Sequence, residues 1–265
     1  MSNTSYQTYL INLDRATERL EMMENEFNRI QLPFIRISAV DAKNLDKESF
    51  QVKNRYDRDL LPGEIGCFLS HVKTLKTFLD SDKDFAVIIE DDAKFVDDFV
   101  SAIEKTLNAY SDLPDKHQWD VLKLINNRRR NIFVQSVDEK YFIGACGKSI
   151  PITTLAAIWT RKGAEKFLRK VNSEKPIIQR PIDCELQHPW EYNLLIYNLL
   201  PTTVASQDLP TQIVKSDNVE RKAKFLHQIR YELNRFFPKI FYYTNQHGLG
   251  KYWESFVAKK TEKVK

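Results

Sequence analysis

The chain has 265 residues, 42% of them hydrophobic, which is enough to bury the core of one large α/β domain, with or without an appendage. Its three cysteines have no CxxC spacing, which argues against a disulfide framework and a zinc site and favours a reducing compartment. Residues 219–265 hold 11 Lys or Arg and 4 Asp or Glu, a local charge of +7, whereas the rest of the chain sums to −3, which gives the net charge of +4. We therefore expect a polyanionic partner for that segment and not for the whole molecule.

Neither a signal peptide nor a membrane span is recognisable. Residues 1–8 lack a basic stretch followed by an apolar run, and nowhere do about 18 apolar residues run together. We therefore expect a soluble or peripheral protein of the cytoplasm.

The first predicted elements form a β-α-β unit. Residues 6–13 (YQTYLINL) have the aromatic and branched side chains of a strand, and apolar residues follow at helical spacing over residues 20–30. Pro33 ends that helix, and residues 34–40 (FIRISAV) have the composition of a second strand. This order is typical of a parallel sheet and of a nucleotide-binding half-domain.

The middle of the chain alternates in the same way. Residues 61–80 carry apolar side chains on one helical face, and residues 85–89 (FAVII) form the uninterrupted apolar run of a strand covered on both faces. We expect Asp97 or Asp98 to cap a helix over residues 99–110.

The later predicted elements complete an α/β fold. In chain order they are a strand at 119–125, a polar and basic loop at 126–131, a strand at 155–159, a helix at 163–171, a helical stretch from 181 to 198 and a return to the sheet at 202–206.

Three acids, Glu90, Asp91 and Asp92, directly follow the apolar run FAVII. In open α/β sheets the carboxyl ends of the strands face the ligand crevice. Carboxylates there can bind Mg²⁺ or Mn²⁺, which in turn neutralises a diphosphate, and the chain lacks the glycine-rich loops GxGxxG and GxxxxGK[ST] that otherwise hold phosphates. The alternative interpretation is a solvated strand end near a helix start.

Five segments, in this order, resemble glycosyltransferase family 25. They are YLINLDRATER (9–19), AVDAKNL (39–45), LPGEIGCFLSH (61–71), VIIEDDAKF (87–95) and WDVLKL (119–124). The resemblance runs from about residue 6 to about residue 217, and GEIGCFLSH followed by EDD is its specific part. It implies a GT-A-type, Rossmann-like mixed sheet flanked by helices, a UDP-sugar donor, Mn²⁺ or Mg²⁺ at the acidic motif, and inversion at the anomeric carbon.

The resemblance also suggests a substrate. The family includes bacterial lipooligosaccharide galactosyltransferases and collagen galactosyltransferases, and the shortness of this chain and its lack of a signal peptide favour the first branch. We therefore expect transfer of galactose or another hexose from a UDP-hexose to a hydroxyl of a lipooligosaccharide core, by a catalytic domain at residues 1–218. The alternative is a non-catalytic module that binds anionic lipid or nucleic acid through residues 219–265; RNA-binding aromatic motifs are absent, so no nucleic acid is expected.

Family positions identify candidate site residues. Those assigned to the donor are Ile11, Asn12, Leu13, Arg19, Ser70, His71, Glu90 and Asp91. Asp92 and Glu90 are assigned to the metal. Alternatives remain for three of them: Asn12 as a cap, Arg19 in a helix-surface ion pair with Glu18 or Glu21, and His71 as a core histidine.

Asp183 matches the family's Pro-x-Asp position and is the candidate general base, since an inverting transferase needs a carboxylate to take the acceptor's proton. The alternative for Asp183 is a helix N-cap. Gln207 and Ser216 are candidates for the donor site, and His188 is a candidate third metal ligand. For Arg128–Arg130 the favoured interpretation is plain solvation, and the alternative is contact with an anionic saccharide.

Residues 219–265 combine their basic charge with ten aromatic residues. Such a mixture suits the anionic inner face of the inner membrane, where we expect peripheral docking. Pro238 and residues 248–250 predict two short helices, and the alternative is that the aromatic side chains pack onto the catalytic domain.

Overall fold

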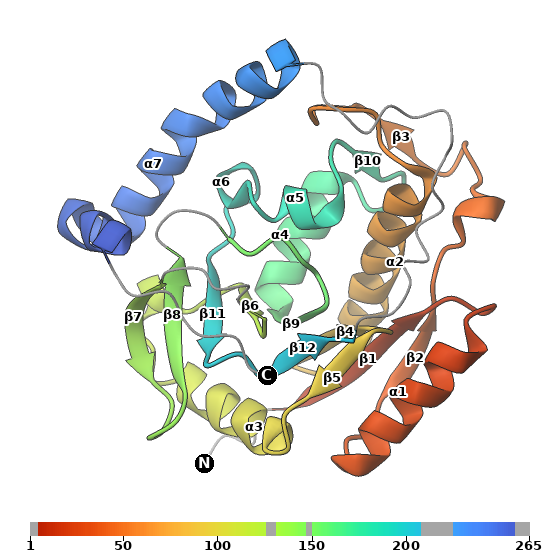
Figure 1. Cartoon of the computed structure of the whole chain (residues 1–265), viewed down its shortest axis with the longest axis horizontal. Helices are drawn as coiled ribbons and strands as arrows, with labels where there is room; N and C mark the ends of the chain where they lie inside the picture. The colour runs from red at the N-terminus through yellow and green to blue at the C-terminus, as the bar shows by residue number, and fades with distance from the viewer. Residues whose placement is uncertain (1–4, 126–130, 147–149, 208–224, 258–265) are drawn as a thin grey trace.

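The computed structural model describes residues 5–125, 131–146, 150–207 and 225–257, which form a mixed sheet covered by helices on both faces (Figure 1). In spatial order the main sheet consists of β2 (Ile35–Ser38), β1 (Tyr6–Asn12), β4 (Phe85–Glu90), β9 (Ala156–Thr160), β6 (Val121–Lys123), β11 (Ile196–Leu200), β8 (Phe142–Cys146) and β7 (Asn131–Ser136). Strands β2, β1 and β4 are parallel, β9 is antiparallel to both of its neighbours, and β11 is parallel to β6. The predicted α/β class with a mixed, helix-flanked sheet is confirmed.

Helices cover both faces of the sheet. The α-helices are α1 (Thr17–Arg29), α2 (Pro62–Leu79), α3 (Phe99–Tyr110), α4 (Arg161–Val171), α5 (Ile182–Glu185), α6 (Pro189–Tyr192) and α7 (Phe225–Val257). Short 3-10 helices η1 (Ala42–Asn44) and η2 (Asp115–His117) and the two-stranded sheets β3 (Gln51–Val52) with β10 (Ile177–Ile178) and β5 (Ala93–Phe95) with β12 (Val204–Ser206) complete the fold.

Alternation along β4 separates two cores. Phe85, Val87 and Ile89 pack with α1 and α3, whereas Ala86 and Ile88 pack with α2 and α4. Because side chains alternate along a strand, a fully apolar run is what a strand between two helical layers requires. The prediction for residues 85–89 is confirmed.

Two predictions for the later part of the chain are wrong. Residues 182–198 are not one helix: after α5 and α6, Asn193 takes a left-handed conformation and the chain enters β11. The apolar run of β11 is buried at every position between β6 and β8. Residues 204–206 pair with β5 outside the main sheet.

A hairpin formed by β7 and β8 was not predicted. Asn131 is the first residue of β7 and not the end of a loop. Residues 126–130 lie outside the described ranges. Asp98 occupies the N-cap position of α3, but its side chain accepts hydrogen bonds from Lys140 and Tyr141 in place of the helix amides.

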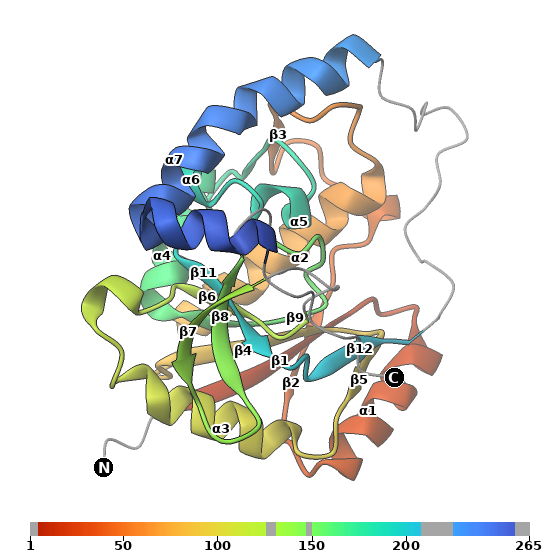
Figure 2. The same ribbon diagram turned by 60° about the vertical axis from the view of Figure 1, so that its left-hand side comes forward.

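The C-terminal helix α7 lies beside α6 and β7 (Figure 2). It is interrupted at Gly248, where φ is 78°, as expected for the glycine region, but it continues through Pro238. Pro238 cannot donate to the carbonyl of Asn234, and both residues are exposed, so water can bind that carbonyl.

The predicted domain boundary at residue 218 falls outside the described ranges. Among the described residues, no helix combines the length and the apolar composition that crossing a membrane requires.

Candidate active site

The acidic motif and the end of β1 lie at one edge of the sheet. β1 and β4 are parallel neighbours, with Ile11 opposite Glu90, so both strands end at the same edge. Residues 91 and 92 then turn the chain into β5. The carboxyl ends of parallel strands are where α/β sheets place their ligands.

A cavity of about 240 Å³ opens at this edge. Its lining residues are Ile11, Asn12, Leu13, Arg15, Arg19, Ala39, Val40, Ala42, Gly63, Cys67, Ser70, Glu90, Asp91 and Asp92. Of the residues assigned to the donor and the metal from family positions, all but His71 line it, whereas the further candidates Gln207 and His188 do not. The structure therefore brings together residues that are up to 81 positions apart in the chain.

Asp91 is fixed by two side chains from the start of the chain. Its carboxylate accepts from Asn12 Nδ2 at 2.8 Å and from Arg19 Nη1 at 2.7 Å. The side chains of Arg19 and Asp91 are each 13% exposed, so the ion pair is largely buried. The alternative of a helix-surface pair between Arg19 and its neighbours on α1 is wrong.

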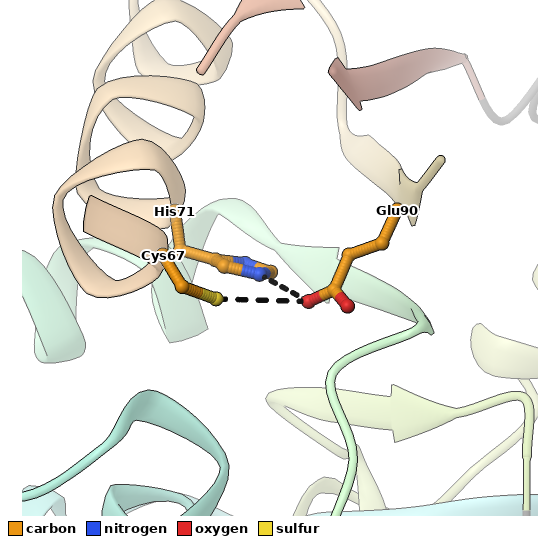
Figure 3. Close-up of side chains that lie close together, drawn as sticks. All are labelled: Cys67, His71 and Glu90. Atoms are coloured by element: carbon orange, nitrogen blue, oxygen red, sulfur yellow. Dashed lines mark hydrogen bonds and ion pairs between the residues drawn. The ribbon is translucent and has the colours of Figure 1, made fainter. Parts of the chain in front are cut away.

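Glu90 turns toward α2, where His71 and Cys67 point at its carboxylate (Figure 3). His71 Nε2 lies 2.9 Å from Glu90 Oε1, and Cys67 Sγ lies 4.0 Å from the same oxygen. Burial acts to raise the pKa of Glu90, but the interactions with His71, Thr154 and Lys123 together outweigh it, and the pKa is lowered. His71 is thus a buried histidine, as the alternative interpretation predicted, and its partner is the first acid of the motif.

Asp92 is the least compensated acid of the motif. Burial and the negative charges of Glu90 and Asp91 raise its pKa, and Ser206 Oγ donates to it at 3.2 Å. A divalent cation would relieve this repulsion, so the acids facing the cavity fit the predicted Mn²⁺ or Mg²⁺.

A second donor set is less suited to such a cation. Ligand atoms of Cys67, His71 and Glu90 lie within 4.8 Å of one another. Burial and the charges of Glu90 and Asp183 raise the pKa of the Cys67 thiol well above its usual range. A protonated thiol is a poor ligand, and Mn²⁺ and Mg²⁺ prefer oxygen. The assignment of Asp92 and Glu90 to a metal stays a prediction.

Asp183 faces the same polar centre from α5. Burial raises its pKa, the Cys184 amide and Lys123 oppose the rise, and Glu90 adds to it. Pro181, not Asp183, is the N-cap of α5, although Asp183 Oδ1 accepts from the Cys184 amide at 2.8 Å. A raised pKa increases the basicity of the carboxylate, which is the direction that the predicted role of Asp183 as a general base requires.

Lys123 is a site residue that the sequence reasoning missed. It lies on β6, is fully buried, and its Nζ donates to the carbonyl of Thr153. Burial lowers its pKa to about 8, against the opposing charges of Asp183 and Glu90. The signal in the sequence was a single lysine within the apolar strand WDVLKL.

A family model described as glycosyltransferase family 25 (LPS biosynthesis protein) matches residues 5–184, more than half of the chain. The chain belongs to glycosyltransferase family 25. A glycosyltransferase 25 family member from Anopheles gambiae is 30% identical over 175 residues, 61% of this chain. Procollagen galactosyltransferase 1-B from Xenopus laevis is 26% identical over 230 residues, 81% of this chain. The chain spans only 28% and 34% of these two relatives.

Among solved structures, a Drosophila galactosyltransferase determined with manganese, UDP-Gal and xylobiose overlaps this family 25 chain with a TM-score of 0.34. The overlap covers 86% of this chain and 79% of that structure at 9% identity.

The remaining candidates of this family 25 chain have other contacts. Ser70 Oγ accepts from the Val40 amide at 2.8 Å and so holds the loop that lines the cavity. Gln207 Nε2 donates to the carbonyl of Ala93, the residue that follows the acidic motif. His188 lines a different cavity, so the idea of His188 as the third metal ligand is wrong. Ser216 and Arg128–Arg130 lie outside the described residues.

Asn12 does not cap α1. Ala16 occupies the N-cap position, and Asn12 Nδ2 donates to the Ala16 carbonyl at 3.2 Å as well as to Asp91. Asn12 Oδ1 accepts from Arg36 Nε at 3.0 Å. The buried amide therefore connects the end of β1 to the acidic motif.

Proposed function

We propose that this chain is an inverting hexosyltransferase that moves galactose or another hexose from a UDP-sugar to a saccharide hydroxyl. The observation that supports it is that Asn12, Arg19 and the three acids line one and the same cavity, at the carboxyl ends of β1 and β4. Family membership supports the reaction class, while the acceptor and the stereochemistry are part of the proposal.

The donor fits the chemistry of this cavity. The apolar side chains of Ile11 and Leu13 offer a surface for the nucleoside, and the guanidinium groups of Arg15 and Arg19 are suited to the diphosphate. A bound Mn²⁺ or Mg²⁺ would supply further neutralisation of the departing UDP, with Asp92 and Glu90 as its ligands.

Asp183 is the proposed general base. Its carboxylate takes the proton of the acceptor hydroxyl while the hydroxyl oxygen attacks the anomeric carbon and the bond from that carbon to UDP breaks. Attack from the face opposite the leaving UDP inverts the anomeric carbon. Buried Lys123 keeps positive charge beside Asp183 and Glu90, which favours the ionised carboxylate that the step requires.

For the acceptor we propose a lipooligosaccharide core. The description of the family as one of LPS biosynthesis supports it, whereas a frog relative is named for procollagen. Both acceptors are therefore compared in the same assay.

The test measures UDP release and product formation with UDP-Gal or UDP-Glc, with Mn²⁺ or excess EDTA, and with deacylated lipooligosaccharide, a procollagen peptide or no acceptor. We expect UDP-Gal, Mn²⁺ and lipooligosaccharide together to give the fastest transfer, with a β-linked product. Equal UDP release with and without every acceptor would contradict transferase activity.

We also propose that the protein is cytoplasmic and docks peripherally on the inner face of the inner membrane. On α7 the side chains of Leu233, Phe237 and Phe241 are 64%, 75% and 68% exposed. Residues 219–265 are basic, which complements an anionic surface, and aromatic rings favour headgroup depth.

A further inference from the structure

A second cavity, of about 460 Å³, lies between α7 and the segments around α5 and α6. Its lining residues are Asn54, Arg55, Tyr56, Arg180, His188, Glu191, Arg230, Tyr231, Asn234 and Arg235. They come from the segment after β3, from the residues on either side of α5, from α6 and from the first half of α7, and α7 lies beside α6 (Figure 2). None of these residues lines the first cavity, the one at the acidic motif.

The cavity is rich in positive charge. Four arginines line it together with one carboxylate, Glu191. Glu191 accepts from Arg180 Nη2 at 2.9 Å and from Arg55 Nη1 at 3.3 Å, so one carboxylate is shared by two guanidinium groups. Two further acids bind lining arginines: Glu185 pairs with Arg180, and exposed Glu232 with Arg235. Four guanidinium groups thus face three carboxylates.

Several buried donors at this cavity lack an acceptor within the described part of the chain. They are Arg180 Nε, Arg235 Nε and the Tyr231 hydroxyl. Arg180 is 3% exposed and Arg235 is 9% exposed, so water reaches these side chains poorly. A buried N–H or O–H without a partner is costly, and a ligand that brings several acceptor oxygens into the cavity would remove that cost.

The electrostatic state of His188 agrees with this environment. Burial and the positive charges of Arg180, Arg235 and Arg55 lower its pKa to about 3, although the Cys184 carbonyl, 2.8 Å from Nδ1, opposes the shift. A neutral imidazole surrounded by cations indicates a positive field across the cavity.

The cavity adjoins the proposed general base. Cys184 Sγ lies 3.5 Å from the Tyr56 hydroxyl, and Cys184 directly follows Asp183 in α5. Asp183 faces Lys123 and Glu90, whereas Arg180, at the other end of this short segment, faces the second cavity. Two tyrosines also line the cavity, Tyr56 and Tyr231, with their ring centroids 5.7 Å apart.

We propose that this cavity binds a phosphate group carried by the acceptor saccharide. Guanidinium groups match the tetrahedral oxygens of phosphate, and the position beside α5 would place the rest of the saccharide toward Asp183. The assignment to the acceptor rests on the proposed transferase function; the phosphate site itself does not.

Direct binding tests the site without any reaction. Inorganic phosphate is titrated into the full chain by calorimetry, in EDTA and saturating UDP, which exclude the metal and donor sites. Because Arg230 is exposed, Arg230→Gln should fold, and loss of a charge-assisted contact should weaken phosphate binding by about 10-fold. Lys251→Gln removes a charge from α7 outside the cavity and should bind phosphate like the wild type. Unchanged affinity in Arg230→Gln, or no phosphate binding by the wild type, overturns the proposal.

Kinetics test the acceptor assignment. For a saccharide acceptor with and without its phosphate group, Arg230→Gln should raise KM about 10-fold only for the phosphorylated form, leaving donor KM and kcat unchanged. If phosphate binds in an Arg230-dependent way but no acceptor is used, the transferase function fails and the phosphate site stands. Phosphatidic acid vesicles that compete with phosphate, where a soluble sugar phosphate does not, would overturn the acceptor assignment in favour of a lipid headgroup.

Discussion

At the scale of single residues, three consecutive acids have three different environments. Glu90 binds His71 on α2, Asp91 binds Arg19 on α1, and Asp92 meets Ser206 on β12. Successive side chains point in different directions where a strand turns, so adjacent carboxylates reach different elements. The motif therefore combines two fixed acids with one that lacks a cationic partner at hydrogen-bond distance among the described residues.

Asp92→Asn should lower the transfer rate by about 100-fold or more, because metal stabilisation of the departing diphosphate is worth several kcal/mol. Initial rates at saturating donor and acceptor measure the effect. Asp112→Asn, at an exposed position outside the cavity, is the matched control. Full wild-type activity in excess EDTA would contradict the metal assignment.

Asp183→Asn should keep UDP-sugar affinity while lowering kcat by about 10² to 10⁴, the usual effect of removing a general base. Donor binding by calorimetry and turnover by UDP release separate the two quantities. Near-normal turnover would leave Asp183 only its hydrogen bond to the Cys184 amide.

At the scale of elements, α2 is positioned by a close approach at Gly66. A Cβ added there would lie 2.6 Å from the carbonyl oxygen of Val40. Val40 is one of the residues that line the cavity at the acidic motif. Since a backbone atom cannot move aside without shifting the loop, the helix and the cavity wall depend on the same glycine.

Gly66→Ala should lower the free energy of unfolding by about 1–3 kcal/mol, as overpacking typically does, and should also weaken UDP binding. Urea denaturation and calorimetry measure the two effects. Gly250→Ala is the control, because a Cβ there meets nothing within 4 Å. Equal stability of the two variants would show that the loop yields easily.

The helix α7 has two apolar sides. Tyr242 is 9% exposed, and its hydroxyl donates to the Leu194 carbonyl at 2.8 Å, which anchors one side to the sheet domain. Leu233, Phe237 and Phe241, spaced four residues apart, project from the other side into solvent. The packing alternative predicted for the tail thus holds for one side, and the other remains free for a surface.

Vesicle co-sedimentation tests the proposed docking. Full-length protein should bind vesicles with anionic lipid, bind neutral ones weakly, and dissociate as salt rises, because exposed charges are screened. Phe237→Ser with Phe241→Ser should reduce binding severalfold, whereas Phe133→Ser, exposed on β7, should not. Equal sedimentation of all variants, or none with anionic vesicles, would contradict docking through α7.

At the scale of the whole molecule, both cavities depend on segments distant in sequence that meet around α5 and the strand ends. Buried ionisable groups in such junctions link stability to pH. His188 is 2% exposed, and its lowered pKa means that the folded protein keeps it neutral down to about pH 3.

The unfolded chain takes up a proton at His188 near its ordinary pKa of 6.5, while the folded protein does not until about 3. The contribution of His188 to the free energy of unfolding should therefore be most favourable above pH 6.5 and should fall as the pH decreases from 6.5 toward 3. In urea denaturation at several pH values, His188→Gln should reduce this loss by about 2–4 kcal/mol. A variant with the wild-type pH dependence would assign the loss to other groups.

Much of the first half of the molecule could be predicted from its sequence. The order β1, α1, β2, α2, β4 follows from local periodicity and from breakers such as Pro33, and the acids after β4 had to lie at a strand's carboxyl end. The site residues near these strand ends could be predicted for the same reason, because their placement depends on neighbours close in the chain or on one parallel strand pairing.

Only the tertiary structure decided the rest. The apolar residues of β11 suit a helix or a strand equally well, and the space between β6 and β8 made them a strand. Lys123, Asp183 and Glu90 lie on three separate elements, and Arg55, Arg180 and Arg230 come from three segments that are far apart in the chain. Sequence spacing carries no information about these contacts, because the residues are far apart in the chain. The packing of helices and strands brings them together, and burial and long-range pairing there outweigh local preference.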